Sequence, residues 1–303
     1  MSIRYLTYDQ IDKKQWDQCI SEATNGLIYG YSFYLDQMCP GWEALVWNDY
    51  EAVFPLTGNR KWKIHYLYQP AFTACLGLFA KAPTAALLQA FLEAIPEKFR
   101  YWDISLNPGN FFSLEKFNLH QRMNYVLPLS APYSIIAAGY RENIRRNITK
   151  NEKAGNSCHR DVPLGAVLTL ARGQVPQYGA VKEQDLIRFE QLCRQLLEKK
   201  MAKIYGIQSP AGELLSGCIF FFSHKRAFYI LPANHPNGRT AGASHALIDA
   251  FIKDHATQDL LLDFEGSDIS SLAFFYSSFG ATEEKYSALR LNKLPRLVRW
   301  LKK

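Results

Sequence analysis

Residues 260–280 read LLLDFEGSDISSLAFFYSSFG, and this stretch decides the fold class. A short apolar run, typical of a buried strand, ends in two carboxylates, Asp263 and Glu265. A polar loop follows, and then a segment of helical pattern carries Tyr276 and closes on Gly280. A strand that ends in acidic residues and leads into a tyrosine-bearing helix is typical of a site where one group loses a proton while another gains one.

The same alternation of strand and helix patterns runs through the whole chain. In the first half we expect strands at 3–7, 44–47, 51–56, 64–68 and 101–106, and helices at 8–21 and 84–95. In the second half we expect helices at 183–199 and 242–255, and strands at 203–208, 214–223, 227–231 and 260–264. The pattern predicts an α/β (α+β) protein.

The two halves also resemble each other. Residues 89–104 align without gaps on residues 249–264, at a shift of 160 positions. The identities are Ala90, Phe91 and Asp103 with Ala250, Phe251 and Asp263. This repeat, with the matching order of elements, predicts two tandem domains, at 1–130 and 131–303, each a mixed sheet flanked by helices. A single large α/β domain is the alternative.

Composition excludes several classes of protein. With 48% hydrophobic residues the chain can bury substantial cores, so we do not expect disorder. No apolar stretch reaches the roughly 18 to 20 residues of a membrane span, and the mixed N-terminus does not resemble a signal peptide, so we expect a cytoplasmic protein. The six cysteines and seven histidines lack metal-ligand spacing, and we expect no metal site. The net charge of +7 favours anionic partners.

A basic helix is predicted at 134–155, where the second domain begins. Arg145, Arg146 and Lys150 lie within about one turn of each other on it, and together they suit a phosphate or carboxylate group of a substrate. Gly155 suits the position just after the helix. The alternative interpretation is an ordinary solvated helix face.

A second candidate anion site is the segment GRTAGAS at 238–244, which leads into the helix predicted at 242–255. A glycine-bearing turn would let the backbone N–H groups of Gly242, Ala243 and Ser244 approach a phosphate at the helix N-terminus, and Arg239 would add a charged contact. An ordinary helix-entry turn is the alternative.

The candidate proton-transfer groups are Glu265, Asp263 and Tyr276. Acyl transfer to an amine needs a base, because the amine is protonated at neutral pH, and a carboxylate at a strand end can fill that role. We favour Glu265 over Asp263, because Asp263 aligns with Asp103 in the other half and is then better explained as a residue that holds loop backbone. Tyr276 would protonate the leaving group.

These motifs resemble the GNAT (GCN5-related N-acyltransferase) family. The segment from Tyr276 to Gly280 matches its Tyr-x-x-x-Gly helix, although Ala281 stands where an aromatic residue is usual, and Arg239 and Gly242 match its pyrophosphate loop. The basic helix is similar to one in the Fem-type aminoacyltransferases and their relatives, which carry two GNAT units in tandem. The whole organisation is similar, but the motif match covers only about 140–155 and 238–281.

The resemblance implies transfer of an acyl group, acetyl or aminoacyl, to an amine acceptor in a cleft between two GNAT-like domains. It implies acetyl-CoA or another acyl-CoA as donor, a degenerate first domain, and oxyanion donors near 231–233. Two alternatives stay open. One is a Fem-type peptidoglycan transferase that takes its donor from aminoacyl-tRNA and has a peptidoglycan precursor rather than a small molecule as acceptor. The other is a non-catalytic ligand-binding module.

Overall fold

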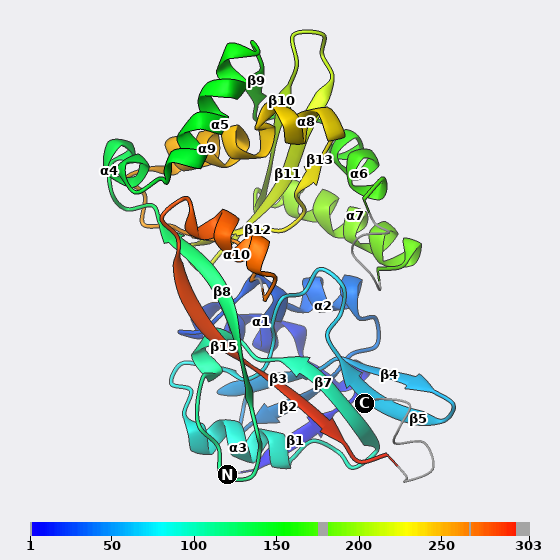
Figure 1. The fold of residues 1–303 in the computed structure, drawn as a ribbon. Coiled ribbons are helices and arrows are strands. Elements are labelled where there is room, and N and C mark those ends of the chain that lie inside the picture. The colour runs from blue at the N-terminus through cyan, green and yellow to red at the C-terminus, as the bar shows by residue number, and fades with distance from the viewer. Residues whose placement is uncertain (1, 175–180, 267, 295–303) are drawn as a thin grey trace. The chain divides into compact units, whose positions relative to one another are not determined.

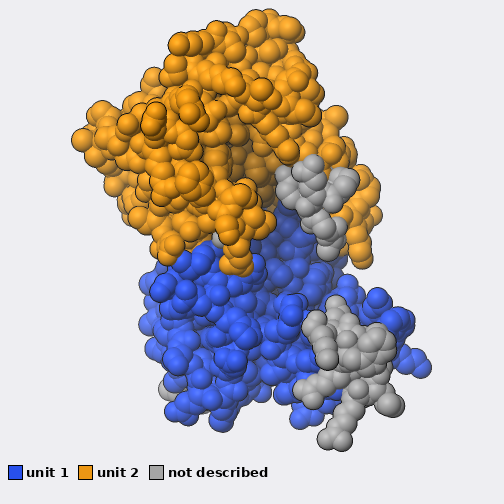
Figure 2. All heavy atoms as spheres, in the orientation of Figure 1, with its two compact units in different colours: residues 1–123, 285–303 blue, residues 124–284 orange. Residues whose placement is uncertain are grey.

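The computed structural model describes residues 2–174, 181–266 and 268–294, and its chain divides into two compact units (Figure 1). Unit 1 comprises the described residues of 1–123 and 285–303, and unit 2 comprises those of 124–284 (Figure 2). The division differs from the predicted domains in two ways. The boundary precedes residue 130, and the chain returns to unit 1 after Glu284. The chain crosses between the units within β8 (His120–Pro128) and β15 (Thr282–Asn292).

Unit 1 carries the strand and helix patterns of the first half. Its strands are β1 (Ile3–Leu6), β2 (Glu43–Trp47), β3 (Ala52–Leu56), β4 (Gly58–Lys61), β5 (Ile64–Tyr68), β6 (Phe79–Ala80) and β7 (Phe99–Ser105). Its α-helices are α1 (Lys13–Glu22), α2 (Ser32–Met38) and α3 (Ala85–Glu93), and single 3-10 turns occur at Tyr8–Gln10, Ile28–Gly30 and Pro108–Asn110. The segment expected as one helix from residue 8 is therefore a 3-10 turn followed by α1.

Two sets of strands form the sheets of unit 1. One sheet has the order β1-β2-β3-β6, and the other runs β4-β5-β7-β15 within this unit. Thr84 caps the N-terminus of helix α3, where its hydroxyl accepts the Leu87 N–H, as the sequence predicts. Its apolar face buries Leu88 and Phe91 with Phe54 of β3, which explains why this helix forms at the expected position.

Unit 2 contains the remaining elements. Its helices are α4 (Tyr133–Ala138), α5 (Glu142–Lys153), α6 (Leu164–Arg172), α7 (Glu183–Glu198), α8 (Pro236–Ala241), α9 (Ala243–His255) and α10 (Ser270–Ser277). Its strands, besides β8, are β9 (Ser157–His159), β10 (Ala202–Gln208), β11 (Leu214–Ser223), β12 (Arg226–Tyr229), β13 (Ala233–Asn234) and β14 (Leu261–Asp263). They follow the order β8-β14-β12-β11-β10-β9, and β13 pairs with β11.

The basic segment differs from the single helix that we expected. It is broken at Gly139–Arg141 into α4 and α5, while Gly155 takes the left-handed conformation (φ +73°) just after α5, as predicted. Tyr140 lies at the break, buried with only 4% exposed, and its ring meets Phe279 edge to face at 5.4 Å. At the same break the Arg141 N–H donates to the carbonyl of Ser278, so the segment between α4 and α5 is bonded to the end of α10.

Candidate functional site

Strand β14 ends where the sheet of unit 2 opens. Strands β12 and β14 are parallel and pair at three positions, of which the last is Phe228 with Asp263. Beyond that pair the chain after β12 stays with β11, because Ile230 donates its N–H to the carbonyl of Ile219. Ligands of parallel sheets bind at the carboxyl ends of strands that part in this way. Glu265, two residues beyond the last pair, therefore lies at the open end of the sheet.

Asp263 is buried and fully engaged. Its Oδ2 lies 2.6 Å from Nη1 of Arg226, and its Oδ1 accepts hydrogen bonds from the Asn124 side chain at 2.9 Å and from the Glu265 N–H at 2.8 Å. Arg226 also binds both carboxylate oxygens of Glu284, each at 2.8 Å. This geometry matches the alternative in which Asp263 holds loop backbone, and it leaves Asp263 poorly suited to act as a base.

Asn124 connects this ion-pair cluster to the loop after β14. Its side-chain amide donates to Asp263 and, at 3.1 Å, to Glu284, while its carbonyl oxygen accepts the N–H groups of Tyr125 and Gly266. The backbone on both sides of Glu265 is thus fixed by side chains. Sequence analysis missed Asn124, Arg226 and Glu284. The available signal was Arg226, a charged residue at the start of an apolar strand.

Glu265 is held in an unusual state. Its backbone has φ +67°, a left-handed conformation that is uncommon outside glycine. Its Oε1 atom is buried and has no hydrogen-bond partner among the residues that the structure describes. Burial away from water raises the pKa of this carboxyl group to about 8. A group with such a pKa can take up and release a proton near neutral pH, as acid–base catalysis requires.

Tyr276 belongs to the same region of unit 2. It lies on α10 with 6% of its surface exposed, and its ring stacks on Phe264, the residue before Glu265, with centroids 4.6 Å apart. The rings of Tyr125 and Tyr229 lie at 6.4 and 6.5 Å. The structure therefore places Tyr276 against Phe264, the residue that precedes Glu265 at the end of β14. The role of Tyr276 as an acid stays a prediction.

The segment expected to be a phosphate-binding turn has a different local structure. Residues 236–241 form helix α8, and Gly242 (φ +72°) joins it to α9. Gly242 and Ala243 are buried, and a Cβ atom on Gly242 would lie 2.6 Å from the carbonyl oxygen of Asn147 on α5. Glycine is thus required here by the close packing of α5. Arg239 is exposed and Ser244 half-buried; binding of phosphate by these four residues stays a prediction.

The basic residues of α5 do not share one role. Arg145 donates to the carbonyl oxygens of Ala137 and Ala138, at 3.3 and 2.8 Å, and so caps the C-terminal end of α4. Arg146 and Lys150 are exposed on the same helix. Arg145 therefore has a structural function that the sequence did not reveal, and a substrate contact by the three residues is still a prediction.

The segment at 231–233 is partly paired, because Ala233 pairs with Gly217 of β11. Pro232 lies in the gap between β12 and β13, and the strand expected at 227–231 ends at Tyr229. Binding of an oxyanion by the backbone at 231–233 stays a prediction.

Two classes of feature are not found in the described part of the chain. Within residues 2–174, 181–266 and 268–294 there is no group of three or more His, Cys, Asp or Glu side chains that could hold a metal ion. The helices in these ranges are each too short or too polar to cross a membrane.

Comparison with solved structures places this geometry in a known fold. The crystal structure of FemX matches with a TM-score of 0.66 and 14% identity, covering 100% of both chains. L-PGS from Bacillus licheniformis matches with a TM-score of 0.56 and 12% identity over 94% of this chain and 93% of that one. The C-terminal domain of a protein described as a lysylphosphatidylglycerol synthetase, from Agrobacterium fabrum, gives 0.56 and 9% over 96% and 94%. The chain has a GNAT-like fold, which it shares with FemX.

By sequence, no protein-family model and no curated protein matches the chain. The GNAT-like fold of mixed α/β content confirms the predicted fold class. At these identities the likeness shows the fold alone, so the function must be argued from the site.

Proposed function

We propose that this chain transfers an acyl or aminoacyl group to an amine, with Glu265 as the base. The observation that carries the proposal is the half-buried Glu265 at the open end of β14, whose Oε1 atom is shielded from water and has no hydrogen-bond partner among the described residues. The fold supports it, because FemX, L-PGS and the C-terminal domain of a protein named as a lysylphosphatidylglycerol synthetase share this architecture. A structural carboxylate would be paired, as Asp263 is.

The raised pKa suits the reaction. An amine acceptor must lose a proton to attack an acyl group, and a carboxylate with a pKa of about 8 is a far better proton acceptor than one with the ordinary value of 4.5. Glu265 would remove the proton as the new C–N bond forms, and Tyr276 would donate a proton to the leaving group. At pH 7 about one tenth of Glu265 would be ionised, so the rate should rise about tenfold per pH unit and level off above about 8.

We propose acyl-CoA as the first donor to test, with Arg239 as the phosphate contact at α8. The packing of Gly242 and Ala243 against α5 favours a second candidate, aminoacyl-tRNA, because it removes the open backbone turn expected for the CoA pyrophosphate. The exposed Arg146 and Lys150 suit either an anionic donor or an anionic acceptor. The acceptor would be a small-molecule amine or an amine of a peptidoglycan precursor.

The donor can be tested by calorimetric and thermal-shift titration with acetyl-CoA and CoA, on wild type and on Arg239→Glu. Ligand at 100 times its Kd should add about 2.7 kcal/mol of stability. Saturable binding that the substitution abolishes would support acyl-CoA. No binding to wild type would exclude it and direct the search to aminoacyl-tRNA.

The base can be tested by turnover. Glu265→Gln should lower the transfer rate by about 10² to 10⁴ and remove the rise toward pH 8, whereas Glu198→Gln, an exposed glutamate of the same unit, should change neither. An unchanged pH profile in Glu265→Gln would refute Glu265 as the base. Donor binding without any turnover in wild type would favour the non-catalytic module.

A further inference from the structure

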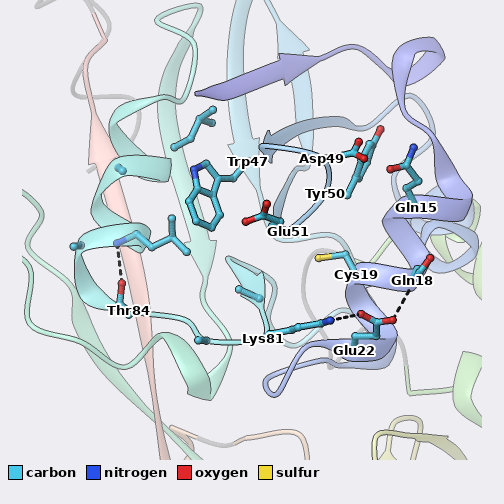
Figure 3. Close-up of a pocket in the computed structure, with 16 residues that line it drawn as sticks. Gln15, Gln18, Cys19, Glu22, Trp47, Asp49, Tyr50, Glu51, Lys81 and Thr84 are labelled. Carbon is cyan, nitrogen blue, oxygen red and sulfur yellow. Dashed lines mark hydrogen bonds and ion pairs between the residues drawn. The ribbon is translucent and has the colours of Figure 1, made fainter. Parts of the chain in front are cut away.

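Unit 1 contains a pocket whose lining residues lie between Ile3 and Ala90, whereas Glu265 belongs to unit 2. Its volume is about 940 Å³, and its residues come from α1, α3, the turn between β2 and β3, and the segment after β6. Figure 3 shows Trp47 and Glu51 on one side, with Gln18, Cys19 and Glu22 of α1 facing them. This volume lies within the range of small-molecule sites in proteins, roughly 300 to 1,000 Å³.

The wall formed by the turn at 48–51 is fixed in a strained conformation. Tyr50 has φ +60°, which is rare for a bulky side chain, and Asn48 has φ +49°. The Tyr50 hydroxyl accepts the Asp12 N–H at 2.7 Å, where Asp12 caps the start of α1. The turn is thereby tied to the helix across the pocket. Backbone strain of this kind persists only where the surroundings enforce it, and it often accompanies binding sites.

The charges around the pocket favour a cation. Lys81 is neutralised by Glu22, with Nζ and Oε2 2.7 Å apart. Asp49 and Glu51 have no ion-pair partner among the described residues, and Glu51 only accepts a 3.2 Å hydrogen bond from Asn48. Arg4 donates a 3.0 Å hydrogen bond to the carbonyl of Asn48 on the same turn, so the two carboxylates outnumber the one guanidinium there and leave a net attraction for a positive charge.

The rest of the lining is mostly apolar. Trp47, Ile3 and Leu87 lie around the cavity, and Trp47 offers an aromatic face near the Glu51 carboxylate. Burial raises the pKa of the Cys19 thiol to about 12, so its sulfur is neutral and adds to the apolar lining. An aromatic ring beside a carboxylate is a good environment for an ammonium group.

We propose that this pocket binds a small molecule made of a cationic amine attached to an apolar or aromatic body. The ammonium would contact Glu51 and the Trp47 ring, with Asp49 adding to the attraction, and the body would lie toward Leu87 and Cys19. The pocket has no part in the proton transfer proposed for Glu265, so either proposal can fail without the other.

The test uses two probes of similar shape and opposite charge, 2-phenylethylamine and 3-phenylpropionate, titrated calorimetrically into the full chain. We expect saturable binding of the amine, roughly in the millimolar range for so small a probe, and no binding of the acid. Glu51→Gln should weaken amine binding about tenfold and Asp49→Asn about threefold. Glu115→Gln removes an exposed glutamate of unit 1 away from the pocket and should leave binding unchanged.

Several outcomes would overturn the proposal. They are absence of saturable amine binding to wild type, equal binding of the acid, or an equal loss of affinity in Glu115→Gln. Trp47→Leu tests the aromatic contribution. The double variant with Glu51→Gln should bind the amine more weakly than Glu51→Gln alone. If the amine still bound the double variant as tightly as wild type, the binding would lie elsewhere. Circular dichroism of each variant would verify that unit 1 is folded.

Discussion

Replacement of Glu265 by glutamine tests whether this carboxyl group is buried without a partner. Its ordinary pKa is 4.5, and burial raises it to about 8 in the folded chain. Because the folded state binds the proton more tightly, the contribution to stability is complete below about pH 4.5 and is lost as the pH rises toward 8. That window spans roughly 3.5 pH units at about 1.4 kcal/mol each. Across it the free energy of unfolding of wild type should fall by up to about 5 kcal/mol relative to that of the glutamine variant, whose side chain does not ionise.

The assay must report on unit 2, and its buried thiols provide this. Cys193 and Cys218 are completely buried there, so a thiol reagent modifies them only when the unit opens. The ratio of labelling rates in variant and wild type at one pH cancels the intrinsic reactivity of the thiol. If closing is faster than labelling, this ratio follows the opening equilibrium. Between pH 5 and pH 9 the labelling ratio should change roughly a thousandfold, which corresponds to about 4 kcal/mol in the free energy of opening. Wild type should open more readily at high pH.

Glu198→Gln is the matched control, because it removes an exposed carboxylate from the same unit. Its labelling ratio to wild type should be nearly constant with pH. If Glu265→Gln behaved in the same way, the carboxyl group would be ordinarily hydrated. The reasoning from its burial, and the base assignment with it, would then be refuted.

Three further predictions concern the scaffold of the site. Arg226→Gln should destabilise unit 2 by about 3 kcal/mol in the same thiol assay, because the buried Asp263 and the half-buried Glu284 lose their cation. A loss below about 1 kcal/mol would contradict the cluster. Gly242→Ala should lower the stability of unit 2 by at least about 1 to 3 kcal/mol, because of the positive φ of Gly242 and its packing against α5. Gly165→Ala is the control, since there is open space around Gly165, and it should be neutral or slightly stabilising. Equal effects of the two substitutions would be inconsistent with the close approach. Asn124→Ala should speed amide hydrogen exchange at Gly266 and lower the transfer rate about tenfold or more; unchanged exchange would show that Asn124 does not hold this loop.

The regular elements were largely predictable from local pattern. The helix expected at 183–199 is observed at Glu183–Glu198, and the strand at 64–68 is observed with its exact bounds. The helix has a strong hydrophobic period, and the strand is a short run rich in β-branched and aromatic residues that ends before Pro70, so local pattern was enough to place both. The break at Gly139–Arg141 was not predicted; it lies where Tyr140 and Arg141 contact Phe279 and Ser278, which are far away in the chain.

The same reasoning separates the parts of the candidate site. Glu265 and Tyr276 could be proposed because they belong to one continuous segment, in which Glu265 follows a strand and Tyr276 lies on the next helix. The residues that hold Glu265 in place could not, because Asn124, Arg226 and Glu284 come from three separate strands. Only the pairing of β8, β12 and β14 brings the first two beside Asp263. Pairing between distant strands is not encoded in any local pattern.

The return of the chain to unit 1 through β15 has a consequence for the order of folding during synthesis. Strand β7 of unit 1 pairs with β15 from Tyr101–Asn292 to Ser105–Ala288, so unit 1 lacks a strand until the ribosome has made these residues. Unit 2, in contrast, is one continuous segment from Asn124 to Glu284. At about 5 to 20 residues per second, the interval is on the order of 8 to 30 s. During it the edge of β7 is available to other strands, which makes unit 1 the part of the molecule most in need of chaperone protection.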